Sequence, residues 1–376
     1  MKYWRFAALT SLLPILIATN DARAVTYKAT LLHPTSGYGR SAGFGVSGNT
    51  QVGFGDPAVG DGPHALLWNG TAESVVDLHP TGFTQSIAES NYGNVQVGYG
   101  GNDPLFYYNL SNHALLWQGT TESVVDLHPP GFGNTVAKDV WGQIQVGFGK
   151  SLTSAYSHAL LWNGSAESVI GLHPAGYLES AALAVSPSGQ VGGTGGSFGP
   201  AHAMLWKGTS ESAVDLHPAG YSTSTALGIS GDRQVGYGQQ LPIAGGDAHA
   251  LLWSGTAESV IDLNPSWCLT SVAQSISGNL QVGHGFDGSI DRALLWNGTA
   301  DSVVDLHQFL IDLPITMTRS YAVDIDDNGT IVGNGYDGNF EYAIMWTPVP
   351  EPSTWVSIYC GLVGMSLVTR CVRRTR

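Results

Sequence analysis

Short runs of alternating apolar and polar residues, separated by turn-forming residues, recur along the middle of the chain. The most regular run is His-Ala-Leu-Leu-Trp, followed in several copies by Asn-Gly. Its tryptophan returns at intervals of 43 to 50 residues, at Trp68, Trp117, Trp162, Trp206, Trp253, Trp296 and Trp346. A period of this length is typical of repeats in which each unit is one small sheet that cannot bury its apolar face alone.

Turn signals and period-two alternation divide each unit into four expected strands. In the first unit these cover Ser41–Ser47, Gln51–Gly55, His64–Trp68 and Glu73–His79. Small residues dominate the first strand, which suits the crowded innermost position of a propeller blade. The fourth strand is richer in β-branched residues, which suits the outer edge. The sequence thus predicts an all-β, seven-bladed propeller over residues 25–348.

The two ends of the repeat array complement each other. The last unit has no fourth strand, while the chain after residue 24 begins with a fourth-strand segment whose Leu32-His33-Pro34 matches Leu78-His79-Pro80. We therefore expect the N-terminal strand to complete the last blade. This closure removes the exposed edge that an open array would leave.

Composition narrows the possible partners. Charged residues make up 12% of the chain, and between Val25 and Pro350 there are 8 basic and 27 acidic residues. This acidic balance argues against nucleic acid, whose phosphates require Lys and Arg. Cys268 is the one cysteine in the repeats, with Cys360 and Cys371 near the C-terminus, so no disulfide is expected in the propeller. The roles of these three cysteines stay open, acylation of the last two among them.

Both termini carry features of targeting signals. Residues 1–24 combine a basic start, an apolar stretch and the small residues Ala22 and Ala24, the pattern of a secretory signal peptide cleaved by signal peptidase after Ala24. An uncleaved membrane anchor is the alternative. Residues 349–376 contain Pro350-Glu351-Pro352, an apolar segment over 355–368, and Arg370, Arg373, Arg374 and Arg376. A short membrane helix ending on the cytoplasmic side fits this order, and an ordinary tail anchor is the alternative.

The C-terminal segment resembles the PEP-CTERM sorting signal of Gram-negative bacteria. That resemblance implies recognition by an exosortase, first on the outer side of the inner membrane and then with release to the surface or the exterior. The repeats resemble those of the HAF-type extracellular repeat family, through His64-Ala65, His113-Ala114 and their equivalents. That family has no established activity, so the resemblance bears on fold and location.

Repeated polar residues are candidates for sites, but their repetition favours a structural role. One histidine closes most units, at His33, His79, His128, His173, His217 and His307, and we interpret these as turn or cap residues rather than as metal ligands. The carboxylates that recur in the fourth strands receive the same interpretation. Asp324 to Gly329 imitates the start of a calcium loop but lacks its closing glutamate, and a plain turn is favoured. We expect no catalytic residue, metal or cofactor.

Irregular loops between the second and third strands are the more informative feature. Aromatic residues in or near such irregular segments, Phe106, Tyr107, Tyr108, Trp141 and Trp267, are candidates for binding a sugar or a protein. The sequence predicts a non-enzymatic, exported surface or matrix protein that contacts polysaccharide or another surface protein. A hydrolase or lyase acting on extracellular polysaccharide is the alternative, and a purely structural spacer is a third possibility.

Overall fold

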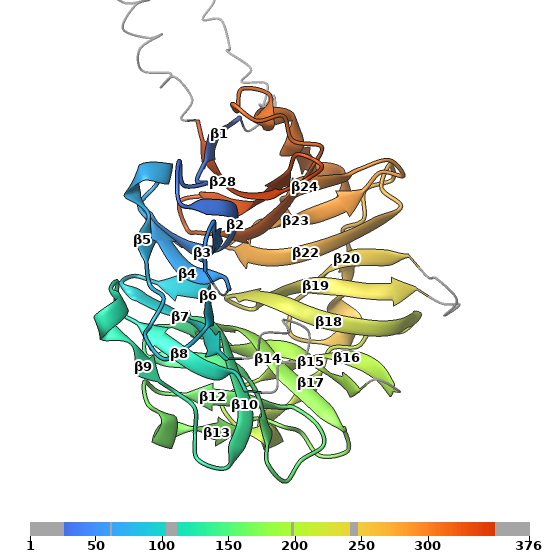
Figure 1. Ribbon diagram of the computed structural model, residues 1–376. Coiled ribbons are helices and arrows are strands. Elements are labelled where there is room, and N and C mark those ends of the chain that lie inside the picture. The colour runs from blue at the N-terminus through green and yellow to red at the C-terminus, as the bar shows by residue number, and fades with distance from the viewer. Residues whose placement is uncertain (1–25, 61, 103–110, 197–198, 241–246, 350–376) are drawn as a thin grey trace, which may run out of the picture.

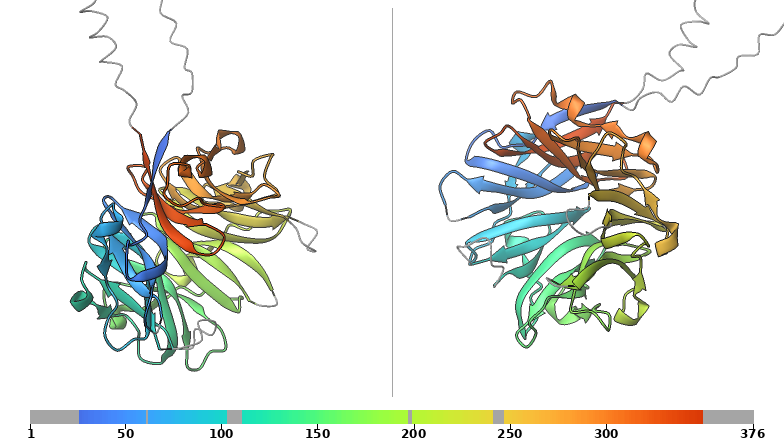
Figure 2. Two further views of the ribbon diagram at one scale, coloured as in Figure 1. Left: turned by 45° about the horizontal axis from the view of Figure 1, so that its top comes forward. Right: turned by 90° about the vertical axis from the view of Figure 1, so that its right-hand side faces the viewer.

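Seven four-stranded antiparallel sheets surround a central axis (Figure 1, Figure 2). The computed structural model describes residues 26–60, 62–102, 111–196, 199–240 and 247–349, and the count of sheets refers to these. The predicted seven-bladed propeller is confirmed. The predicted signal peptide, Phe106 to Tyr108, and residues 350–376 of the predicted sorting segment lie outside the described residues. In the described part of the chain, no helix is long and apolar enough to cross a membrane.

Each blade has an innermost, a second, a third and an outermost strand. The innermost strands are β2 (Tyr38–Ser47), β6 (Gln85–Tyr92), β10 (Phe132–Trp141), β14 (Glu179–Ser186), β18 (Tyr221–Ser230), β22 (Thr270–Ser277) and β26 (Arg319–Ile325). The second strands are β3 (Thr50–Pro57), β7 (Val95–Gly101), β11 (Ile144–Ser151), β15 (Gly189–Gly196), β19 (Arg233–Gln240), β23 (Leu280–Phe286) and β27 (Ile331–Tyr336).

The outer half of each blade is shorter. The third strands are β4 (His64–Trp68), β8 (His113–Trp117), β12 (His158–Trp162), β16 (Gly199–Trp206), β20 (Ala248–Trp253), β24 (Asp291–Trp296) and β28 (Glu341–Pro348). The outermost strands are β5 (Val76–Asp77), β9 (Val125–Asp126), β13 (Ile170–Gly171), β17 (Val214–Asp215), β21 (Ile261–Asp262), β25 (Val304–Asp305) and, in the last blade, β1 (Tyr27–Leu31). Six of these outermost strands have two residues, so the prediction of a long fourth strand is wrong in extent.

A 3-10 turn replaces the expected start of each short outer strand. These turns are η1 (Ala72–Ser74), η2 (Thr121–Ser123), η3 (Ala166–Ser168), η4 (Ser210–Ser212), η5 (Ala257–Ser259) and η6 (Ala300–Ser302), and η7 (His307–Leu310) follows β25. In η1 the Ser74 hydroxyl donates to the Thr71 carbonyl at 2.6 Å and accepts the Asn69 N–H at 2.8 Å. A local side-chain bond of this kind competes with extended backbone, which is why the β-branched pattern alone misjudged the segment.

The apolar core lies between blades. Each repeat tryptophan is fully buried and packs on the preceding blade: Trp117, for example, clusters with Val52, Leu67 and Leu78. Because every such cluster joins two neighbouring sheets, a single blade would expose it. The ring is therefore stabilised through seven similar interfaces rather than through one central core.

A histidine bond repeats at these interfaces and closes the ring. The Ser86 hydroxyl of one blade accepts the N–H of Ala65 in the preceding blade at 2.9 Å and lies 2.9 Å from Nδ1 of His79, whose Nε2 lies 3.1 Å from the Phe83 carbonyl. Nε2 must donate to that carbonyl, so in the neutral ring Nδ1 accepts from Ser86. Burial, and then His64, lower the pKa of His79, which favours this neutral form.

The N-terminal strand uses the same bond. β1 pairs antiparallel with β28, and His33 at its end lies 2.9 Å from Ser41 of the first blade, whose hydroxyl accepts the Ala343 N–H. The predicted completion of the last blade by the N-terminal strand is confirmed.

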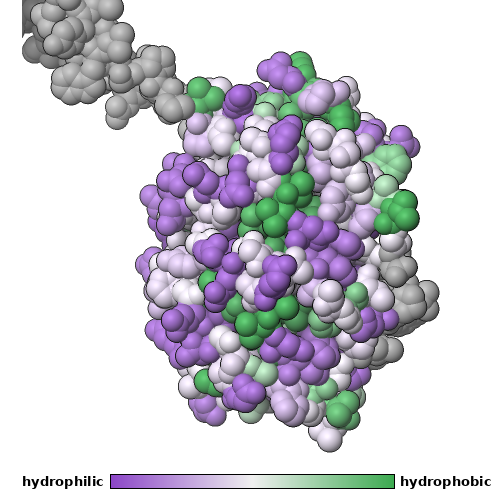
Figure 3. Space-filling model, turned by 60° about the vertical axis from the view of Figure 1, so that its left-hand side comes forward, coloured by the Kyte–Doolittle hydropathy of each residue, from purple (hydrophilic) through white to green (hydrophobic). Residues whose placement is uncertain are grey.

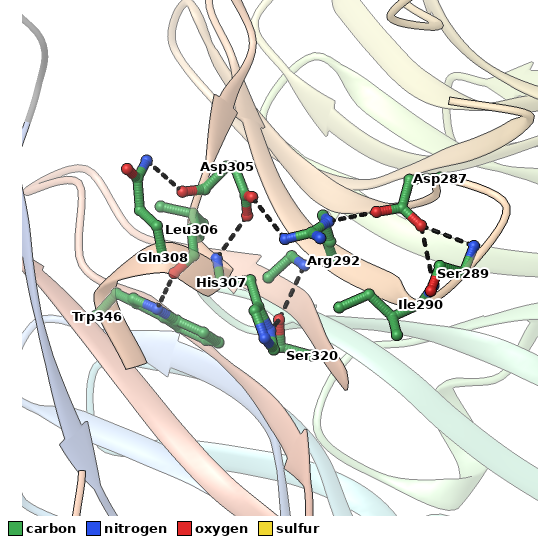
Figure 4. Close-up of polar contacts among 11 residues, drawn as sticks. Asp287, Ser289, Ile290, Arg292, Asp305, Leu306, His307, Gln308, Ser320 and Trp346 are labelled. Atoms are coloured by element: carbon green, nitrogen blue, oxygen red, sulfur yellow. Dashed lines mark hydrogen bonds and ion pairs between the residues drawn. The ribbon is translucent and has the colours of Figure 1, made fainter. Parts of the chain in front are cut away.

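An ion-pair cluster within the sixth blade lies beside its interface with the seventh blade (Figure 4). Arg292 occupies the position that His64 has in the first blade. It contacts Asp287 at 2.7 Å and Asp305 at 3.1 Å. His307 keeps the bond to Ser320, and the Trp346 indole N–H donates to the Leu306 carbonyl at 3.1 Å. The last interface thus preserves the histidine bond although its surroundings differ.

One glycine in the second strand of each blade makes room for a bulge in the innermost strand. A Cβ atom on any of these glycines would lie 1.9 to 2.1 Å from a carbonyl oxygen of the innermost strand. The glycines are Gly53, Gly98, Gly147, Gly192, Gly236, Gly283 and Gly333. Opposite each, the pairing shifts by one residue, as between Ala137 and Asp139 in β10. The Val-Gly step of each repeat is thus required by backbone contact.

We expect Gly147→Ala to lower the free energy of unfolding by about 3 kcal/mol, because the methyl group would strike the Val136 carbonyl. Gly171→Ala is the matched control, since that strand glycine has open space around it and should change stability by less than about 0.5 kcal/mol. Urea unfolding of the two variants measures both effects. Equal losses in the two variants would contradict the role of the bulge contact.

Candidate active site in the central cavity

The bulges direct one extra residue per blade towards the axis. These residues are Phe44, Glu89, Lys138, Leu183, Leu227, Gln274 and Val323, and all seven line a central cavity of about 1050 Å³. The backbone is alike in all blades, but the side chains are aromatic, charged, polar or aliphatic. The cavity is therefore chemically asymmetric within a regular scaffold.

The cavity opens at one end of the ring. Its lining includes the hairpin turns between innermost and second strands, such as Gly48, Gly231 and Asn328. We call this end the turn face, and the opposite end, which carries the connections between second and third strands, the loop face. The irregular loops in the sequence predicted that a binding site would lie on the loop face. The cavity instead opens at the turn face.

Two aspartates follow bulge residues on nearly opposite sides of the ring, in the third and seventh blades. Asp139 accepts from the Ser90 hydroxyl at 2.5 Å and from the Val185 N–H at 2.7 Å. Asp324 accepts in the same way from the Ser275 hydroxyl at 2.6 Å and the Val46 N–H at 2.8 Å. Each carboxylate thus ties together the preceding and the following blade while lining the cavity.

Burial raises the pKa values of both aspartates above the usual range of a carboxyl group. It raises the pKa of Asp139 to about 7, against the hydrogen bonds from Ser90 and Val185, and the nearby charge of Asp324 adds to the rise. Burial likewise raises the pKa of Asp324 to about 6. Asp139 therefore holds a proton over a substantial fraction of time at neutral pH, which is the state that a general acid requires.

An ion pair lies beside Asp139. The Lys138 ammonium contacts the Glu89 carboxylate at 2.6 Å. Burial, with a further contribution from Glu89, raises the pKa of Tyr99, which also lines the cavity. Lys138 is the one cationic side chain among the described residues of the lining, and its charge is already paired.

The predicted binding aromatics lie at different ends of the molecule. Trp141, at the end of β10, lines the cavity at the turn face, where its ring lies 5.5 Å from that of Tyr92. Trp267 lies between β21 and β22, in a connection on the loop face, and is not part of the lining. The sequence grouped the two tryptophans; the structure separates them. Tyr92 was not among the predicted residues.

The repeated polar residues on the rim form structural contacts. His64 Nδ1 lies 2.7 Å from Asp77, and its ring stacks on His79 with centroids 4.0 Å apart. Three other blades carry the same histidine–aspartate pair at the same distance. Within the described ranges, no group of three or more His, Cys, Asp or Glu is placed to hold a metal ion.

The calcium-like segment is a turn in which the carboxylates are occupied by hydrogen bonds. Asp326 accepts the N–H groups of Asn328 and Thr330 at 2.9 and 2.8 Å, while Asp327 accepts from the Ser277 hydroxyl at 2.7 Å. Asp324 lies deeper, bonded to Ser275. These carboxylates point to different partners rather than to one centre.

Cys268 is buried, and burial raises the pKa of its thiol to about 12. A thiol that stays protonated at neutral pH is a poor nucleophile and metal ligand. The structure therefore gives this cysteine a packing role beside Gly285.

The surface outside the cavity is mixed in polarity. On the side drawn in Figure 3, apolar residues form small groups separated by hydrophilic ones. Such scattered groups are ordinary for a folded surface. The cavity is thus the more distinctive feature.

Comparisons with solved structures identify the same architecture in enzymes. The chain is similar to the propeller domain of the Trilobed protease from Pyrococcus furiosus (TM-score 0.54, 10% identity, covering 83% of this chain and 94% of that one). It is also similar to an oligogalacturonate lyase from Vibrio parahaemolyticus (TM-score 0.51, 12% identity, 87% and 97% covered) and to a puromycin hydrolase (TM-score 0.51, 11% identity, 85% and 55% covered). At these identities the likeness establishes the fold alone.

No protein-family model matches the chain. No curated protein matches it either.

The interpretation as a non-enzymatic adhesion protein is wrong. It rested on the two terminal targeting signals and on the apparent absence of an asymmetric polar cluster. The cavity does contain such a cluster, formed by Asp139, Asp324 and the Lys138–Glu89 pair. The similar propellers named above are moreover enzymes or parts of enzymes. Comparing the seven innermost strands position by position would have revealed Asp139 and Asp324, since the equivalent positions otherwise hold Gly, Ala or Ser.

The two aspartates make a testable contribution to pH-dependent stability. Between pH 4 and 7 the unfolded carboxyl has lost its proton while folded Asp139 keeps it, so raising the pH favours unfolding. Relative to Asp139→Asn, the wild type should lose about 3 kcal/mol of stability across this range. Asp324→Asn should show the same sign over a narrower range, because its folded pKa is about 6.

Urea unfolding from pH 4 to 8 measures this difference. Subtracting the variant's curve from that of the wild type cancels the histidines, whose lowered pKa values act in the opposite direction, reducing stability as the pH falls below about 6.5. Parallel curves for the wild type and Asp139→Asn would contradict the assignment.

Proposed function

We propose that the protein is a hydrolase of neutral extracellular polysaccharide and that the central cavity is its active site. The observation that carries this proposal is the pair of cavity aspartates with raised pKa values, Asp139 and Asp324. Cleavage of a glycosidic bond requires one carboxyl group that donates a proton and one that acts as base or nucleophile.

Asp139 is the better candidate for the acid. Its pKa of about 7 is the higher of the two, and protonation on Oδ1 leaves Oδ2 free to keep the Val185 N–H. Asp324, whose pKa is about 6, is ionised in a larger fraction of molecules at neutral pH and is the candidate base or nucleophile. Enzymes that cleave glycosidic bonds typically hold two carboxyl groups in different environments, which give the two groups different pKa values.

The charge of the cavity favours a neutral substrate. Its lining holds Glu89, Asp139, Asp324, Asp326 and Asp327, but a single cation, Lys138, which is paired. A lyase acting on a polyuronate would need positive charge to bind the substrate carboxylates. The described lining also lacks histidine, so a serine–histidine hydrolase is not favoured.

We also propose that the enzyme is exported and sorted. The N-terminal segment with Ala22 and Ala24, and the C-terminal Pro350-Glu351-Pro352 with its apolar segment and arginines, support processing by signal peptidase and an exosortase in a Gram-negative bacterium. Extracellular polysaccharide would then be accessible to the cavity.

The enzymatic proposal predicts that Asp139→Asn lowers hydrolysis at least about 100-fold, because it removes the proton donor. The assay measures reducing ends released from β-glucan, mannan and xylan. Asp301→Asn, the same substitution on an exposed rim residue, should leave the rate unchanged. Full activity in folded Asp139→Asn would refute the assigned role, whereas unsaturated products from a polyuronate would favour a lyase.

The sorting proposal predicts a processed C-terminus. Mass spectrometry of the protein isolated from its native host should find a chain that ends near Pro350 to Pro352. Replacing Glu351 by Ala should prevent this processing and retain the protein in the membrane fraction, while Glu341→Ala in β28 should not. A mature protein that still contains the arginines at 370–376 would exclude exosortase cleavage.

A further inference from the structure

The rim of the cavity departs from the repeat in two adjacent blades. At the end of the innermost strand, or directly after it, five blades carry a small or acidic residue: Ser47, Ser186, Ser230, Ser277 and Asp326. The second and third blades carry Tyr92 and Trp141 at this position, and both line the cavity. The two aromatic side chains thus form one asymmetric part of the turn-face rim.

Both rings remain accessible although they contact each other. Their centroids lie 5.5 Å apart at an angle of 51°, and the exposed fractions are 42% for Tyr92 and 38% for Trp141. An aromatic surface held by a neighbouring ring presents a flat apolar area at low entropic cost. The apolar face of a pyranose ring matches such an area.

Trp141 also stands in a defined relation to the proposed acid. It follows Asp139 by two residues in β10, with regular pairing to β11 between them. The two side chains therefore lie on the same face of the strand, with Cα atoms about 7 Å apart. A sugar stacked on Trp141 would have its neighbour in the chain close to Asp139.

A buried acceptor lies beside this aromatic pair. Asn91 precedes Tyr92, lines the cavity and is 6% exposed. Its Nδ2 donates to Thr50 Oγ1 at 2.9 Å, while its Oδ1 has no hydrogen-bond partner within the described structure. The other blades carry Val or Ile at this position: Val46, Val140, Val185, Ile229, Ile276 and Ile325. An unpaired buried acceptor costs stability. Because successive strand residues point to opposite faces, Asn91 lies on the side away from Tyr92, and its Oδ1 is closed to a ligand in the cavity.

We propose that Tyr92 and Trp141 form a sugar-binding subsite on one side of the cavity mouth. One pyranose ring of a neutral glycan stacks on this aromatic pair. The subsite rests on the proposed function for its ligand class, but its binding is separable from catalysis. It fixes which side of the cavity the glycan enters.

Binding is best measured by calorimetry in the Asp139→Asn background, which prevents turnover. The probes are the hexaoses of β-1,4-glucan, β-1,4-mannan and β-1,4-xylan. Trp141→Ala should weaken binding of the recognised hexaose about tenfold or more, and Trp141→Phe should restore much of it. Trp267→Ala is the matched control, because Trp267 is similarly exposed but lies outside the cavity.

Asn91→Val is a second control, at a buried position next to the aromatic pair. It replaces the unpaired acceptor with the residue type of the other blades, so the melting temperature should stay the same or rise while hexaose affinity is unchanged.

Several outcomes decide the proposal. Equal affinities of Trp141→Ala and Trp267→Ala overturn the subsite, and so does failure of all three hexaoses to bind at millimolar concentration. If the wild type binds in a Trp141-dependent way but releases no reducing ends, the subsite stands and the hydrolase proposal fails. Should Asp139→Asn not fold, Asp324→Asn provides the inactive background.

Discussion

The contact between one glycine and one bulge carbonyl in every blade determines what the centre of this molecule can be. Because a side chain on Gly147 or its equivalents would overlap that carbonyl, the second strand must carry glycine where the innermost strand bulges. The bulge in turn directs an extra residue to the axis whatever its side chain. Phe44, Lys138 and Gln274 occupy equivalent backbone positions, so the chemistry of the cavity varies without cost to the scaffold.

The contacts between neighbouring blades are similar around the ring, whereas the side chains that line the cavity differ from blade to blade. The serine–histidine bond recurs at them and also closes the ring through His33 and Ser41. At one interface Asn264 replaces the histidine and accepts the Ser271 hydroxyl at 2.6 Å, which matches a neutral imidazole acceptor elsewhere. This arrangement distributes stability evenly around the ring, and a single polar substitution near the axis does not disrupt it.

Sequence reasoning predicted the parts of the structure that depend on burial between blades. The tryptophan period, the strand order and the role of the N-terminal strand follow from apolar patterning. The two-residue outer strands were missed, because Ser74 and its equivalents close a 3-10 turn that alternation cannot detect. The cavity was missed because the small first strands were treated as equivalent. The bulge depends on a contact across two strands, and its effect on Asp139 and Asp324 follows from the folded backbone.

Departure from the repeat is therefore a physical criterion for the site. Residues that recur in most blades, such as the rim His–Asp pairs, have repeated local partners and explain stability. Asp139 and Asp324 are different, because burial opposes their ionisation and raises their pKa values. Each replaces a residue that would cost the fold less. Residues that lower the stability of the fold lie together near one opening of the ring. Binding of a ligand there would offset this cost, which favours a functional site at the turn face.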